Sequence, residues 1–214
     1  VAKLLYVAKR VRPDILTAVQ FLTTRVQQPT EDDWSKLERC LAYLNQERNL
    51  GVTLECDDAV NAVGYFDAAY GVHADFKSHS ASLITLGKGP IYVGCKKQKI
   101  LTKSSTEAEL VSASDGSPKL VGVRRFLRAQ GYVLSPSIVY QDNMSAISLI
   151  KKGRATSEAS KHINIRYFFI KQLVDDGEIQ VVYMPTDDML ADLLTKPLQG
   201  AKFRDLRDRL MNIV

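Results

Sequence analysis

The chain has 214 residues and a net charge of +5, with 45% hydrophobic and 25% charged side chains, the ordinary composition of a globular protein. Every apolar run is far shorter than the ~20 residues that span a bilayer, and no signal-peptide pattern is present, so we expect no membrane association. The three cysteines are scattered without a CxxC pair, which indicates reduced thiols in an intracellular protein and argues against a zinc site. Because the first residue is Val1, we expect a piece of a longer protein.

Residues 1–55 are expected to be helical. The stretch 13–27 begins with a proline and carries apolar residues at helical spacing. The stretch 29–51 has Thr30 as a cap, acids in the first turn and a glycine as a stop. We interpret both helices as packing elements and Trp34 as a core anchor.

After residue 55, apolar strands alternate with helical stretches. The predicted strands are 62–71, two within 80–98 on either side of a turn at 87–90, 136–143 and 179–185; the predicted helices are 105–115, 119–132, 144–153, 163–178 and 186–198, the last opened by Thr186. This order predicts an α/β domain with a mixed sheet, in which an antiparallel meander comes first and helical crossovers add the remaining strands.

Basic residues gather in two groups. Six lysines and no acid lie between Lys77 and Thr106. The second group is Lys151, Lys152, Arg154 and Lys161. Such stretches are often solvated surface, but two of them flanking acidic motifs favour binding of a polyanion.

Two glutamates stand two positions apart in "KSSTEAELVSASDG". Residues so spaced are rotated by about 200° on a helix, so Glu107 and Glu109 cannot share a face. With Ser104 or Ser105 as N-cap, Glu107 lies in the first turn, where its charge suits the helix dipole. Glu109 lies deeper among apolar residues and requires a partner or a metal if it faces inward.

Four acids occupy positions that disfavour them. Asp67 and Asp142 end predicted strands, Glu109 lies in a helix, and Asp192 lies among apolar neighbours. A cap or local hydrogen bond explains any one of them, and for Asp142 followed by Asn143 an Asx turn or a helix cap is the alternative. Together, grouped carboxylates without histidine or thiol suit Mg²⁺ or Mn²⁺. Two such ions ~4 Å apart support in-line phosphodiester displacement.

Five motifs follow one another along the chain: "GYFDAAY", "KKQK…SSTEAEL", "YQDNMSAISL", "SKHINIRYFFI" and "MLADLLTKPL". In order and spacing they resemble the C-terminal end of copia-type retrotransposon polyproteins. The leading "LLYVAKRVRPDILTAVQFLTTRV" and "WSKLERCLAYL" resemble the segment that joins polymerase to ribonuclease H in that family. The resemblance covers nearly the whole chain, and "SSTEAEL" and "ADLLTKPL" are its most specific pieces.

The resemblance implies a ribonuclease H-like fold with a five-stranded mixed sheet flanked by helices over residues 56–214, preceded by a helical connection segment over 1–55. It implies a two-metal endonuclease that uses Mg²⁺, or Mn²⁺, to cut the RNA of RNA–DNA hybrids, leaving a 3′-hydroxyl and a 5′-phosphate. The implied partners are the hybrid and the polymerase part of the same polyprotein, and the implied location is a cytoplasmic retroelement particle.

By motif, the metal-binding acids carry over to Asp67, Glu109, Asp142 and Asp192. Asp67 would bridge both ions, Glu109 and Asp142 would hold the ion nearer the leaving oxygen, and Asp192 the ion nearer the attacking water. The residues expected to contact substrate are Lys96, Lys97, Lys99, Lys103, Ser104, Ser105, Asn143 and His162. Recognition is expected to read backbone and shape and to weaken with salt.

The sequence departs from the family's cellular relatives in the loop before the last aspartate, "YMPTDD", which has no histidine. A catalytic loop histidine is therefore not supported, and His162 is either a packing or cap residue or a substrate contact. Asp187 and Asp188 are interpreted as dipole partners of the last helix. Two hypotheses rival an active nuclease: a catalytically inactive remnant that binds hybrid or double-stranded nucleic acid, and a connection piece that requires the polymerase.

Overall fold

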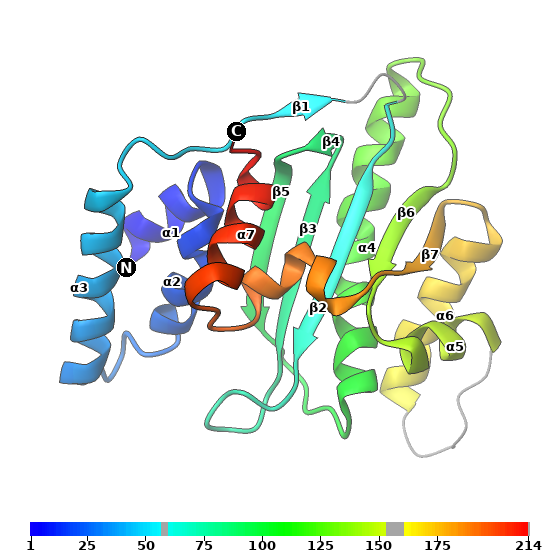
Figure 1. The fold of residues 1–214 in the computed structure, drawn as a ribbon. Helices are drawn as coiled ribbons and strands as arrows, with labels where there is room; N and C mark the ends of the chain where they lie inside the picture. The colour runs from blue at the N-terminus through cyan, green and yellow to red at the C-terminus, as the bar shows by residue number, and fades with distance from the viewer. Residues whose placement is uncertain (57–59, 153–160, 214) are drawn as a thin grey trace.

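The centre of the molecule is a five-stranded mixed sheet with the strand order β5-β3-β2-β6-β7, seen in Figure 1. The computed structural model describes residues 1–56, 60–152 and 161–213. The strands are β1 (Glu55–Cys56), β2 (Val63–Ala69), β3 (His79–Thr85), β4 (Gly87–Lys88), β5 (Pro90–Lys97), β6 (Ser137–Gln141) and β7 (Ile179–Tyr183). Strands β2, β3 and β5 form an antiparallel meander, and β6 and β7 are added parallel to β2. The α/β class and the mixed five-stranded sheet are confirmed.

Helices cover both faces of this sheet. They are α1 (Ala2–Arg10), α2 (Leu16–Thr23), α3 (Glu31–Gln46), α4 (Ser105–Ala129), α5 (Met144–Lys152), α6 (Lys161–Asp175) and α7 (Gly200–Met211), with short 3-10 segments η1 (Pro13–Ile15), η2 (Thr186–Asp188) and η3 (Leu190–Leu194). Within the described residues, no helix has the length and apolar composition required to cross a membrane.

The side chains of each strand alternate between two hydrophobic clusters. One cluster joins Phe66 and Ile84 to the buried residues of α4, α5 and α6. The other joins Ala81 and Leu83 to the N-terminal helices, η3 and α7. Asp67 follows Phe66 in the strand and pairs with Ala81, so its side chain points to the face that carries η3.

The N-terminal helical segment is confirmed, and it shares its core with the sheet. Leu16 and Val19 belong to the same cluster as Leu83. A buried ion pair between Arg12 and Asp14, 2.8 Å long, is joined by the Tyr43 hydroxyl, which donates to Asp14 Oδ2 at 2.6 Å. The two predicted parts, 1–55 and 56–214, therefore share one continuous hydrophobic interior. The boundary between them stays a prediction.

Helix α4 is one 25-residue helix, so the prediction of separate helices over 105–115 and 119–132 is wrong. Pro118 lies inside it and removes a backbone hydrogen bond. Its ring is exposed, however, so it leaves the packed face undisturbed. Leu110 and Leu120 are buried before and after it, and burial of that face holds the helix together across the proline.

The segment 186–198 is not an α-helix as predicted but two 3-10 segments, η2 and η3. Met189 between them takes an extended backbone and is completely buried, which turns the chain so that η3 lies on the sheet. The Thr186 side chain caps no helix. Asp187 and Asp188 pair with Lys202 and Arg209 of α7, a helix that the sequence analysis did not predict.

Trp34 is not a core anchor. Its side chain is 61% exposed, and its indole N–H donates to Glu38 at 2.8 Å. Helix α3 buries Asp33 and Cys40 instead, the residues directly before Trp34 and Leu41, while Leu44 of the predicted stripe does pack against the core. Asp33 is on the inner side because it closes the capping box with Thr30, which confirms the predicted cap.

Candidate metal centre

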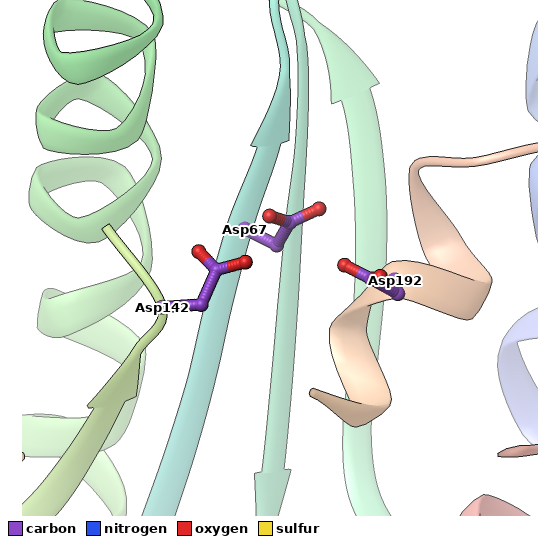
Figure 2. Close-up of side chains that lie close together, drawn as sticks. All are labelled: Asp67, Asp142 and Asp192. Atoms are coloured by element: carbon purple, nitrogen blue, oxygen red, sulfur yellow. The ribbon is translucent and has the colours of Figure 1, made fainter. Parts of the chain in front are cut away.

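Three aspartates from three separate elements converge on one face of the sheet (Figure 2). Asp67 lies in β2, Asp142 directly follows β6, and Asp192 lies in η3. One carboxylate oxygen from each lies within 4.8 Å of the others. Asp67 and Asp192 are buried and Asp142 is half-buried. Because β2 and β6 are parallel neighbours, their carboxyl ends bring the first two together, and η3 brings the third.

The charges in this cluster are unfavourable without a cation. Burial raises the pKa of Asp67, against the opposing effects of Lys196 and Thr195. Burial, followed by the charge of Asp67, raises the pKa of Asp192 to about 6. Carboxyl groups so placed hold protons unless positive charge is supplied nearby.

Thr195 and Lys196, which directly follow η3, supply part of the hydrogen bonding and positive charge that these carboxylates require. Lys196 Nζ lies 2.7 Å from Asp192 Oδ1, and the Thr195 hydroxyl donates to Asp67 Oδ2. Burial would lower the pKa of Lys196, but the charges of Asp67, Asp192 and Asp142 raise it. The sequence analysis assigned these two residues no role, although "TK" belongs to the motif "ADLLTKPL" that it singled out.

Asp142 has a different partner. The Thr186 hydroxyl donates to Asp142 Oδ2 at 2.9 Å. Thr186, expected to cap a helix, therefore orients a carboxylate of the cluster. The side chain that follows Asp142, Asn143, accepts from the Ala146 N–H at 3.0 Å through its Oδ1, so it caps α5, as the cap alternative for this position supposes.

Glu109 lies beside the cluster but is not one of its members. It is 5% exposed, and its Oε2 accepts from Gln141 Nε2 at 3.2 Å. Burial, followed by the charges of Asp67 and Asp142, raises the pKa of Glu109 well above its ordinary value. Of the four predicted acids the structure thus gathers three and places the fourth within their electrostatic reach.

Glu107 is the helix-start charge that the spacing predicts. Its Oε2 accepts from the Lys103 N–H at 2.7 Å, and its own N–H donates to Ser104 Oγ at 3.2 Å. Ser104 is the N-cap and Ser105 the first residue of α4, and both are exposed.

The predicted basic contacts lie where β5 ends and α4 begins. Lys96 pairs with Asp115 at 2.9 Å and Lys97 with Asp75 at 2.8 Å. Lys99 and Lys103 are exposed. His162 is in α6, and its side chain lies outside the described residues.

The donor set fits a hard divalent cation. All three clustered groups are carboxylates, the ligands that Mg²⁺ and Mn²⁺ prefer. Asp192 Oδ2 is buried and has no hydrogen-bond partner within the part of the chain that the structure describes. An unpaired, buried carboxylate oxygen is costly, and a metal ligand is the role that would satisfy it.

The chain is similar in sequence to known proteins. No family model matches the chain. It is 36% identical over 201 residues to the retrovirus-related Pol polyprotein from transposon RE2 of Arabidopsis thaliana, covering 93% of this chain and 14% of that protein. It is 32% identical over 209 residues to the corresponding polyprotein from transposon TNT 1-94 of Nicotiana tabacum, covering 95% of this chain and 15% of that protein. A solved N-terminal ribonuclease H domain from Mycobacterium tuberculosis aligns with a TM-score of 0.44 and 15% identity, over 68% of this chain and 98% of that chain.

The mixed sheet, with an acidic cluster built from β2, the end of β6 and η3, defines a ribonuclease H-like domain. Relatives at 32–36% identity over more than nine-tenths of this chain are copia-type Pol polyproteins, and the chain corresponds to one segment of them. The resemblance carried by the motifs is thereby confirmed. The chain spans 14–15% of the length of these relatives.

Proposed function

We propose that the chain is a metal-dependent ribonuclease H that cuts the RNA strand of RNA–DNA hybrids during reverse transcription of a retrotransposon. The observation that carries the proposal is the convergence of Asp67, Asp142 and Asp192 from distant parts of the chain within 4.8 Å. Its partners would be the hybrid and the polymerase part of the same polyprotein, inside a cytoplasmic retroelement particle.

Asp67, Asp142 and Asp192 would hold two Mg²⁺ ions, or Mn²⁺, and Glu109 would join them by releasing Gln141. When bound, the ions would activate a water and neutralise the charge that develops on the leaving oxygen, giving a 3′-hydroxyl and a 5′-phosphate. The chain's own residues prepare this site by orienting its carboxylates. The Thr195 hydroxyl orients Asp67 by donating a hydrogen bond to its carboxylate. Lys196 Nζ orients Asp192 by donating to its Oδ1 at 2.7 Å.

The substrate would lie over the lysines at the end of β5 and the start of α4. Lys96, Lys97, Lys99 and Lys103 would approach phosphates, and the exposed N-cap region at Ser104 and Ser105 would offer free N–H groups to a phosphate or a 2′-hydroxyl. Since these contacts read backbone rather than bases, we expect binding that depends strongly on salt and little on sequence.

The test is cleavage of a labelled RNA–DNA hybrid by the purified chain in Mg²⁺, beside Asp142→Asn and Asp187→Asn. The second variant makes the same chemical change in an acid whose partner is Lys202, outside the cluster. Cutting by the parent and by Asp187→Asn, with none by Asp142→Asn, would support the nuclease. Hybrid binding without cutting by any of the three would favour the binding remnant, and cutting only after addition of polymerase would favour the connection piece.

A further inference from the structure

The loop 70–78 joins β2 to β3 at the end of the sheet where the aspartates meet. It begins three residues after Asp67, about 10 Å along an extended strand. Ser78 in this loop hydrogen-bonds through its hydroxyl to that of Thr102 at 2.9 Å. The loop therefore lies beside the connection from β5 to α4, and Figure 1 shows both at the lower end of the sheet.

Phe76 in this loop combines two unfavourable features. Its φ is +58°, a left-handed conformation that is an outlier for a bulky side chain. Its side chain is 77% exposed, so the ring contributes little burial in return. Glycine would suit this backbone better, and such an outlier points to a function when the surrounding structure holds it in place.

The surrounding structure does hold it. The rings of His73 and His79 stack on Phe21 of α2, with centroids 4.8 and 4.7 Å away. The Phe76 N–H donates to the His73 carbonyl at 2.8 Å, and the His73 N–H donates to the Lys77 carbonyl at 3.2 Å. The base of the loop is therefore buried and its backbone closed on itself, and Phe76 projects from a fixed position.

The ring stands at the margin of a basic surface. Asp75, the residue before it, pairs with Lys97 at 2.8 Å and with Lys77 at 3.5 Å. Lys99 and Lys103 are exposed at the same end of the sheet, and neither makes an ion pair within 1–56, 60–152 and 161–213. An exposed ring beside lysines suits a nucleic-acid strand, because the lysines attract the phosphates while the ring packs on a base or sugar.

We propose that the loop 70–78 is a second nucleic-acid contact, in which Phe76 packs against a strand of the bound nucleic acid beyond the metal centre. This inference rests on the proposed nuclease function, since it takes the same hybrid as the ligand. It adds a contact that depends on an aromatic face rather than on charge.

The experiment measures hybrid binding by fluorescence anisotropy with the inactive Asp142→Asn chain, at several salt concentrations. Phe76→Gly and Phe76→Trp are compared on this background, with Phe126→Ala as the matched control. Phe126 is also exposed, at 63%, but it lies 21 residues into α4, about 30 Å from the start of that helix. Each variant is tested with a blunt hybrid and with one that carries a single-stranded overhang.

We expect Phe76→Gly to weaken binding about 5- to 140-fold, the range for loss of one base–aromatic contact. Phe76→Trp and Phe126→Ala should bind as tightly as their parent. The slope of affinity against salt should not change, because no phosphate contact is removed. The melting temperature of Phe76→Gly should equal or exceed that of its parent, which separates loss of a contact from loss of folding. A loss confined to the overhang would identify an unpaired base as the ligand; a loss with both would identify the duplex.

Equal binding by Phe76→Gly and its parent would overturn the loop contact alone. Failure of the Asp142→Asn parent to bind any hybrid at low salt would overturn the proposed function together with it.

Discussion

Neutralising Asp192 should stabilise the metal-free protein while abolishing its activity. The pKa of this carboxyl is raised from 3.8 to about 6 by burial and by Asp67. Because a folded-state pKa above the unfolded value disfavours the ionised form, the penalty is absent below pH 3.8 and complete above pH 6. Two units correspond to about 3 kcal/mol. Asp192→Asn also removes the partner of Lys196, a half-buried pair, so the expected net gain is about 1–3 kcal/mol.

The assay is urea denaturation of parent and Asp192→Asn in EDTA at pH 7.5 and pH 5, repeated with Mg²⁺ at pH 7.5. We expect the variant to be the more stable in EDTA at pH 7.5 and its advantage to shrink at pH 5, where the parent carboxyl is already protonated. Mg²⁺ should stabilise the parent more than the variant, since only a binding-competent site gains from the ligand. A variant no more stable than the parent at pH 7.5 in EDTA would refute the reasoning, and Asp187→Asn serves as a control outside the cluster.

Three further predictions concern the frame around the site. Burial lowers the pKa of His79 to about 4, so its neutral form contributes stability that is complete above pH 6.5 and is lost as the pH falls toward 4. The difference in unfolding free energy between parent and His79→Asn should therefore fall by about 1.4 kcal/mol per pH unit over that window. A constant difference in urea denaturation would contradict this. Gly116→Ala should destabilise the fold by about 1–3 kcal/mol, because the added Cβ would lie 2.5 Å from the buried ring of Phe66. Gly122→Ala in the same helix meets nothing within 4 Å and should stabilise the fold by about 0.5–1 kcal/mol. Equal effects in thermal denaturation would argue against the close packing of Gly116 on Phe66. Thr17→Val should cost about 1–3 kcal/mol and lower the cleavage rate, because the Thr17 hydroxyl donates to a buried carbonyl of η3 at 2.6 Å; unchanged stability and rate would show that this bond positions nothing.

The parts of the site that could be predicted from the sequence are those that local pattern determines. Asp142 directly follows β6, and such a strand end is readable from the alternation of the strand and from the polar residue that closes it. Asp67 was also expected to end its strand, but it lies within β2, which continues to Ala69. The helix-start role of Glu107 follows from its place in the first turn after a serine N-cap. Asp192 was found through its family motif, but the form of its segment was not, because η3 exists only where Met189 and the leucines are buried against the sheet, a tertiary effect that overrides helical pattern.

The missed residues share one property, which is that their partners are remote in sequence. Thr195 donates to a carboxylate 128 positions away, and Thr186 to one 44 positions away. Trp34 was misassigned for the related reason that the pattern of α3 does not state which of its faces packs against α2. Pairings of this kind become visible only when the topology is known.

The N-terminal helices therefore contribute to the candidate metal centre and not only to the fold. Asp192 reaches Asp67 because η3 is held on the sheet, and η3 is held from its other side by α2, both through the shared hydrophobic cluster and through the hydrogen bond from Thr17 to Leu193. The same helix supplies Phe21, on which His73 of the β2–β3 loop and His79 at the start of β3 stack. One helix of the connection segment thus supports both the third aspartate and the loop proposed to bind nucleic acid. The predicted boundary near residue 55 thus separates sequence motifs, whereas the residues that support the acidic cluster lie on both sides of it.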